Sequence, residues 1–271
     1  MDLILVGPGR AGLALSLRLT DSGHSVVGVV ARDPSAADVA ATRLESNSLS
    51  WDEDLPSVDL VVVAVRDDAI ASVAERLAPI TSRVEAVVHL SGLTPVSALG
   101  RVDGPLLGSF HPLQTLPDAE TGASMLEGAW AGVTTESDVL ADRLFALATS
   151  IGMHPFELDD AAKPIYHAAA AAAANYPLAA LAMSERLFAA AGVPFEAAGP
   201  LVAAVVANAV SMGPRDALTG PIVRGDVGTV RAQLAAVEQA VPELLEHFKA
   251  MAWATAAAIG STEAMNEMLQ S

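Results

Sequence analysis

Short, mostly apolar runs alternate with helix-like apolar spacing through the first half of the chain. These runs are Leu3–Val6, Val26–Ala31, Leu60–Val65, Ala86–Leu90, Leu106–Phe110, Trp130–Thr134 and Pro155–Leu158. Strands that alternate with helices along a chain form a parallel sheet with helices on both faces. The pattern therefore predicts an N-terminal doubly wound α/β domain of the Rossmann type over residues 1–159.

After Asp159-Asp160 the pattern changes to alanine and leucine at helical spacing, and we predict no further strand. Glycine and proline interrupt this region at Gly192-Val193-Pro194, Gly213-Pro214 and Gly220-Pro221. Such residues end helices and begin turns. The sequence therefore predicts an all-α C-terminal domain over residues 160–271.

Two uncharged stretches, Ile165–Ser184 and Ala197–Pro214, approach the length of a membrane span. The first is mostly alanine, and glycine, proline and asparagine interrupt the second, so neither has the apolar density that insertion requires. Helices without a charged face are otherwise buried in a protein core or between subunits. We therefore expect no membrane contact and a homodimer whose alanine-rich helices pair.

A glycine-rich turn follows the first apolar run and precedes a helical stretch. Its sequence is Gly7-Pro8-Gly9-Arg10-Ala11-Gly12, which has the G-x-G-x-x-G spacing of dinucleotide-binding turns. Gly7 permits a tight turn, Gly9 lets the backbone approach a pyrophosphate, and Gly12 lets helix and strand pack closely. With Arg10 and Ala11, these residues are the predicted pyrophosphate site at a helix N-terminus.

The end of the second strand predicts which dinucleotide binds. Arg32 lies where NAD-binding sites usually place an acid for the ribose hydroxyl. A guanidinium at this point can bind a 2′-phosphate with two hydrogen bonds and stack on adenine, which favours NADP. The alternative is that Arg32 is a solvated charge and that Asp33 binds the ribose.

Charge and composition limit the possible partners. The 271 residues carry a net charge of −17 and no cysteine. The negative charge opposes nucleic acids and anionic membranes, so local arginines, Arg10, Arg32 and Arg66, must attract an anionic cofactor. Six scattered histidines show no metal-ligand spacing, so we expect no metal, and without a signal peptide we expect a cytoplasmic protein.

Polar residues follow several predicted strands, at the edge of the sheet where doubly wound folds bind ligands. The fourth run is followed by His89-Leu90-Ser91-Gly92-Leu93-Thr94-Pro95 and the fifth by His111-Pro112-Leu113-Gln114-Thr115. We expect Ser91 and His111 to lie near a nicotinamide and Gln114 to face a substrate. Either histidine could equally be held by backbone hydrogen bonds at a strand end.

The helical domain opens with Lys163-Pro164-Ile165-Tyr166-His167, and proline at 164 suits the first turn of a helix. Lys163, His167 and Asn175 then share one face of that helix, because they are four and eight residues apart. In a stretch this rich in alanine, three polar residues on one face indicate a catalytic site. A stripe that faces solvent is the alternative.

The order of these motifs resembles the β-hydroxyacid dehydrogenase superfamily, which includes ketopantoate reductase and pyrroline-carboxylate reductase. The segment from His89 to Pro95 resembles the family's strand-end motif, with serine third and proline seventh, and Lys163-x-x-x-His167 resembles its Lys-x-x-x-Asn motif. His89 replaces the usual acid and His167 the usual asparagine. Together with the segment Leu218–Asp226, this set resembles a branch of Rossmann-like proteins with an uncharacterised helical C-terminal domain.

The resemblance implies an NADP-dependent oxidoreductase that reduces a small 2-oxo acid, as 2-dehydropantoate 2-reductase does. Lys163 or His167 would then supply a proton, and Asn175 would orient the substrate. Further contacts to the substrate are expected from Tyr166 and from Arg224, which could equally be a surface arginine. The alternatives are a reductase of imines such as pyrroline-carboxylate, and a non-catalytic NADP-binding sensor.

Overall fold

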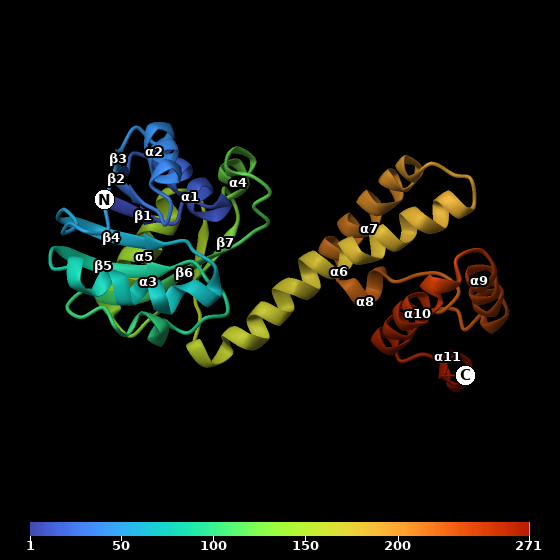
Figure 1. The fold of residues 1–271 in the computed structure, drawn as a ribbon. Helices are drawn as coiled ribbons and strands as arrows, with labels where there is room; N and C mark the ends of the chain where they lie inside the picture. The colour runs from blue at the N-terminus through green and yellow to red at the C-terminus, as the bar shows by residue number, and fades with distance from the viewer. Residues whose placement is uncertain (271) are drawn as a thin grey trace. The chain divides into compact units, whose positions relative to one another are not determined.

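The computed structural model describes residues 1–270, which pack as two compact units, Met1–Ala171 and Ala172–Ser271. The first unit is built on one sheet of eight strands (Figure 1). The strands are β1 (Asp2–Val6), β2 (Ser25–Val30), β3 (Asn47–Ser48), β4 (Val58–Val63), β5 (Val84–His89), β6 (Leu106–Leu113), β7 (Trp130–Thr135) and β8 (His154–Glu157). They confirm all seven predicted runs, and β3 is a short addition.

The sheet order is β3-β2-β1-β4-β5-β6-β7-β8. Strand order reverses at β1, whose neighbours β2 and β4 lie on opposite sides. In doubly wound sheets such a reversal opens a crevice at the carboxyl ends of the strands, where ligands bind. The glycine-rich turn directly follows β1 and therefore lies at this crevice.

Helices cover both faces of the sheet. The helices of the first unit are α1 (Arg10–Asp21), α2 (Pro34–Arg43), α3 (Ile70–Leu77), α4 (Ala119–Met125) and α5 (Asp138–Ser150), followed by the first turns of α6 (Lys163–Ala190). Apolar residues of α1, α2 and α5 pack on one face, with Leu3 and Leu5. Residues of α3 pack on the other, with Ile4 and Val6. The structure confirms the predicted doubly wound α/β fold.

One strand pair departs from the predicted parallel sheet. Strand β7 runs antiparallel to β6, with His111 opposite Gly132. A parallel pair needs a crossover that returns the chain to the far end of the sheet. The seven-residue α4 between these strands packs instead on α1, where a Cβ at Gly122 would lie 2.9 Å from the Ala14 Cβ. The chain therefore stays at the same end, and β7 runs back.

The second unit is helical, as predicted, and the described chain has no strand after Glu157. It contains most of α6, then α7 (Gly199–Met212), α8 (Pro214–Ala217), α9 (Val227–Ala240), α10 (Leu245–Ile259) and α11 (Glu263–Gln270). A small core joins α9, α10 and α11 through Val230, Ala256 and Met265.

Within the described residues, Phe195–Met212 is long and apolar enough by composition to cross a membrane. Its first four residues form a 3-10 helix, so α7 itself has 14 residues.

Candidate functional site

The turn after β1 has a backbone that only glycine fits. Gly7 has a φ of +90°, in the region that side chains rarely adopt, and its N–H donates to the Val30 carbonyl at 2.9 Å. A Cβ at this position would lie 2.6 Å from Val65 Cγ1 and 2.9 Å from the Ala64 carbonyl oxygen. Gly7 therefore closes the turn against the end of β4.

The start of α1 is open to an anion. Gly9 precedes the helix without a side-chain cap, and a Cβ there would meet only the Ala64 oxygen, at 3.9 Å. A Cβ at Gly12, by contrast, would lie 2.7 Å from the Ala64 Cβ, so helix and strand are in close contact. Arg10 and Ala11 form the first turn, which contains no acidic residue. Free N–H groups and the helix dipole at this end suit a pyrophosphate.

Arg32 and Asp33 have different surroundings at the end of β2. The Arg32 side chain is exposed. The Asp33 carboxylate caps α2, since its Oδ1 accepts from the Ser35 N–H at 3.0 Å and the Ser35 hydroxyl at 2.9 Å. The Trp51 indole donates to the Ala31 carbonyl at 2.8 Å and fixes this strand end. Arg32 is thus free to meet a ligand, whereas Asp33 already has a structural role.

The two other candidate arginines lie at the surface. Arg66 is 86% exposed and pairs with Asp68 at 2.9 Å. Arg10 is also exposed and donates to the Pro117 carbonyl at 3.4 Å. Asp68 and Pro117 are exposed, and contacts of this kind at the surface are weak. Either arginine side chain can therefore turn toward a phosphate at a small cost in free energy.

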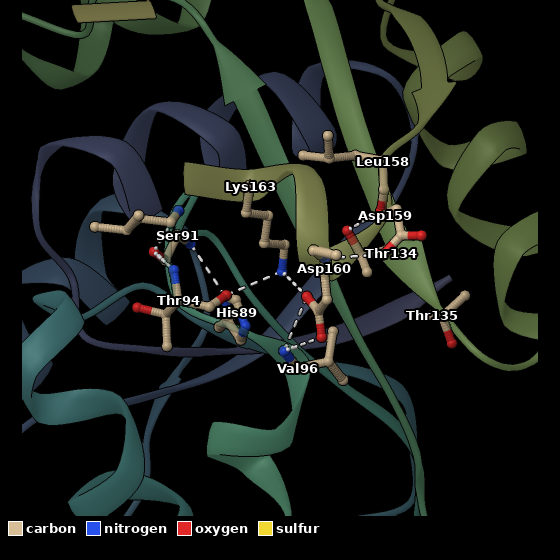
Figure 2. A network of polar contacts seen from close by, with 12 residues as sticks. His89, Ser91, Thr94, Val96, Thr134, Thr135, Leu158, Asp159, Asp160 and Lys163 are labelled. Carbon is tan, nitrogen blue, oxygen red and sulfur yellow. Dashed lines mark hydrogen bonds and ion pairs between the residues drawn. The ribbon is translucent and has the colours of Figure 1, made fainter. Parts of the chain in front are cut away.

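Lys163 lies inside the first unit rather than on an open face. Its side chain is 0% exposed, and its Nζ donates to Asp160 Oδ1 at 2.7 Å and to the Thr94 carbonyl at 2.9 Å (Figure 2). The Asp160 carboxylate also accepts from the Val96 N–H, at 2.9 Å. Burial lowers the pKa of Lys163, and its bond to Asp160 opposes that shift. The lysine thereby ties the start of α6 to the loop after β5.

Ser91 and His89 organise that same loop. The Ser91 hydroxyl accepts from the Leu93 N–H at 3.1 Å and the Thr94 N–H at 2.9 Å (Figure 2). The Ser91 N–H in turn donates to His89 Nδ1 at 3.2 Å. Both side chains are buried, and His89 Nε2 is a buried nitrogen without a hydrogen-bond partner in the described chain. The shape of this loop thus depends on three side chains, His89, Ser91 and Lys163.

A second polar group lies at the end of β6. His111 Nδ1 is 2.7 Å from the Tyr166 hydroxyl oxygen, in the first turn of α6. The exposed His167 ring lies 6.5 Å from the His111 ring, centroid to centroid. Burial lowers the pKa of His111 to about 4 and raises that of Tyr166 to about 12. The structure thus brings together three of the predicted site residues.

The remaining predicted residues lie apart from this group or in the second unit. Gln114 is held by nearby backbone groups, because its Nε2 donates to the carbonyl of Met125, at the end of α4, at 3.2 Å and its Oε1 accepts from the Thr115 N–H at 2.8 Å. Asn175 and Arg224 are exposed residues of the second unit. Asp160 was missed by the sequence analysis, although its position three residues before Lys163 is the spacing of a helical ion pair.

Asp160 also lines a cleft of about 790 Å³. Its walls come from β6, β7, β8 and the start of α5, and they include Glu136, Asp138, Glu157 and Asp159. Such a wall repels a dinucleotide, which is anionic. In this respect the cleft differs from the start of α1, whose first turn contains no acidic residue.

Comparisons with known proteins match two family models to the chain. The model of a Rossmann-like domain matches residues 1–108, and that of a domain of unknown function, DUF2520, matches residues 129–255. A search of curated proteins finds no match.

Three solved structures have a similar fold. A proposed NADP oxidoreductase from Bacteroides fragilis is 20% identical, with a TM-score of 0.79 over 94% of this chain and 98% of its own. A protein from Thermotoga maritima is 23% identical, with a TM-score of 0.74 over 94% and 97%. The 1-pyrroline-5-carboxylate reductase of Streptococcus pyogenes is 17% identical, with a TM-score of 0.67 over 100% and 99%. The chain therefore matches a Rossmann-like model in its first part and the DUF2520 model in its second, and it shares its fold with these three structures.

Proposed function

We propose that the protein is an NADP-dependent oxidoreductase that reduces a small carbonyl acid of the 2-oxo acid type. The observation that carries this proposal is the glycine cradle at the reversal of strand order, with Arg32 exposed beside it. Gly7, Gly9 and Gly12 would hold the pyrophosphate, and Arg32 the 2′-phosphate. Bound NADPH would supply hydride. A pyrroline carboxylate reductase from Plasmodium falciparum with the same fold was solved with NADP bound, which supports the choice of cofactor.

The fold supports an imine substrate as much as a carbonyl substrate. Similar structures include pyrroline-carboxylate reductases and an imine reductase from Streptomyces aurantiacus. The ketopantoate-like specificity implied by the Lys-x-x-x-Asn resemblance therefore remains our proposal. An imine arrives already protonated, so it needs a proton donor less than a carbonyl does.

A screen of NADPH oxidation with 2-oxo acids, aldehydes and cyclic imines tests the function. Oxidation with a 2-oxo acid supports the proposal, and oxidation with imines alone replaces its substrate class. If NADPH binds but nothing oxidises it, the non-catalytic sensor becomes the better description.

Arg32→Ala should remove most of a preference for NADPH over NADH, because it removes the charged fork for the extra phosphate. We expect the ratio of the two dissociation constants to fall by about tenfold or more, as measured by titration calorimetry. Arg101→Ala, at an exposed arginine after the loop of β5, is the matched control. Equal affinity of the unchanged protein for both cofactors would contradict the prediction.

We also propose that the chain is a homodimer through its apolar helices. Leu201, Val205 and Val210 of α7 are 62%, 57% and 84% exposed. Apolar surface of this extent usually marks an interface. Light scattering should give twice the 27.7 kDa chain mass, and Val205→Glu with Val210→Glu should give a monomer. As the matched control, Val39→Glu, at an exposed valine of α2, should leave the dimer intact. If the unchanged protein is a monomer, the dimer proposal is wrong.

A further inference from the structure

A tyrosine and a histidine from two separate elements form a short hydrogen bond at the ligand-binding end of the sheet. Tyr166, in α6, and His111, in β6, are 55 positions apart in sequence, and the tyrosine oxygen lies 2.7 Å from His111 Nδ1. The two rings meet edge to face, with centroids 5.5 Å apart. Phe156, in β8, packs on the tyrosine with ring centroids 5.9 Å apart. These aromatic contacts fix the tyrosine ring, so its hydroxyl has a defined position.

The pair stands over the loop that follows β5. A Cβ at Gly92 would lie 2.7 Å from His111 Cε1 and 2.8 Å from its Nε2, so the imidazole lies against that glycine. Strands β5 and β6 are parallel, with His89 beside Ser109, two residues before His111. Their carboxyl ends therefore lie at the same edge of the sheet as the glycine-rich turn, where ligands of this fold bind.

We propose that Tyr166 is the proton donor of the proposed reduction, and that His111 is a positioning residue that orients the tyrosine hydroxyl and returns a proton to it. This inference rests on the proposed function and names its proton source. It replaces Lys163 in that role, because the Lys163 ammonium is fully buried and engaged by Asp160 and Thr94. The partly exposed Tyr166 can reach a bound molecule, whereas Lys163 cannot.

The proposed proton transfer passes through Tyr166 and His111 in turn. Hydride addition to a carbonyl carbon leaves the electron pair of the C=O bond on oxygen as an alkoxide. The Tyr166 O–H bond then breaks, its proton passes to the alkoxide, and an alcohol and a tyrosinate result. The tyrosinate takes the proton of His111 Nδ1 while His111 Nε2 gains one from water, and hydroxide remains in the solvent. Both side chains are then neutral again, and the reaction as a whole has consumed one proton from the solvent. Tautomer exchange through water then returns the proton to Nδ1.

The surroundings keep both groups neutral over the working pH range. Burial is the main cause that lowers the pKa of His111 to about 4; electrostatic interaction with His167 and with Lys163 lowers it further, and Asp67 opposes the shift. Burial raises the pKa of Tyr166 to about 12. A neutral phenol donates readily to an alkoxide, which is a much stronger base. The pair therefore favours a carbonyl substrate over an iminium ion, which gains little from a donor.

Kinetics with paired tyrosine variants test the donor role. Tyr166→Phe should lower kcat for carbonyl reduction by about 10²- to 10⁴-fold, the usual contribution of a positioned acid, with NADPH affinity unchanged. The matched control is Tyr176→Phe, at the only other tyrosine, which is 63% exposed in the second unit and should keep the full rate. His111→Ala should also be slow, and added imidazole should restore part of its rate, which a merely structural role would not allow.

A second measurement uses the protein without cofactor. The ¹⁵N resonance of His111 Nδ1 should shift in Tyr166→Phe and stay unchanged in Tyr176→Phe, because only the first removes the hydrogen bond. An active protein whose Tyr166→Phe variant is equally fast overturns the donor role alone, and so does an unshifted resonance. If the unchanged protein reduces no carbonyl compound, the proposed function falls, and the donor role with it.

Discussion

Lys163→Met is expected to destabilise the first unit by about 3 kcal/mol, because breaking a buried ion pair leaves its other charge without compensation. The Lys163 side chain is 0% exposed, and its Nζ lies 2.7 Å from the Asp160 carboxylate. Methionine has a similar length and no charge, so the packing of the stem is kept. Asp160 is 35% exposed, which lets water reach it and places the loss at the lower end of the usual range.

Urea unfolding of the full chain measures this loss of stability when the fluorescence signal comes from the first unit only. The chain has three tryptophans, and Trp51 and Trp130 lie in the first unit. In a Trp253→Phe background, tryptophan fluorescence therefore reports that unit only. Adding Asp160→Asn to Lys163→Met should recover part of the loss, since no unpaired charge remains. A loss below about 1 kcal/mol in Lys163→Met would show that the pair is open to water in solution.

Local patterns were enough to predict the sheet and the glycine-rich turn that follows its first strand. The runs that became β1, β2 and β4 are buried on both faces of the sheet, so they consist almost entirely of apolar residues. The glycines of the turn are predictable because their constraints are local. Gly7 needs a positive φ, and Gly12 needs contact with the adjacent strand end at Ala64.

The surroundings of the polar residues depend on contacts between distant segments. Helical spacing places Lys163 and His167 on one face, but Lys163 is buried and His167 is exposed. The difference arises because the loop 91–96 covers the first turn of α6 at Lys163, and the sequence does not show this contact. Likewise, the bond between His111 and Tyr166 joins residues 55 positions apart, which neither motif predicts.

Lowering the pH from 7.5 to 4.5 should cost the first unit about 2 to 3 kcal/mol through His89 alone. His89 is 0% exposed, and burial is the main cause that lowers its pKa to about 4. The nearby Lys163 charge adds to this shift, whereas a polar contact with the Pro95 backbone opposes it, as do the charges of Asp160 and Asp67. Its Nδ1 accepts the Ser91 N–H, so protonation there would also break that bond.

The direction of the effect follows from proton binding in the two states. The unfolded chain binds a proton at His89 below its ordinary pKa of about 6.5, whereas the folded protein does not until about pH 4. The stability from a neutral His89 is therefore complete above pH 6.5 and is lost as the pH falls toward 4. His111 acts in the same direction and range, so the unchanged protein loses stability through both residues.

Paired unfolding measurements at pH 7.5 and 4.5 isolate the contribution of His89. The difference in unfolding free energy between the two pH values should shrink by about 2 to 3 kcal/mol in His89→Gln, whatever the stability of this variant at pH 7.5. His247→Gln, at an exposed histidine of α10, should keep the full difference. If His89→Gln keeps it as well, His89 titrates alike in the folded and unfolded protein, and burial in the loop after β5 does not lower its pKa in solution.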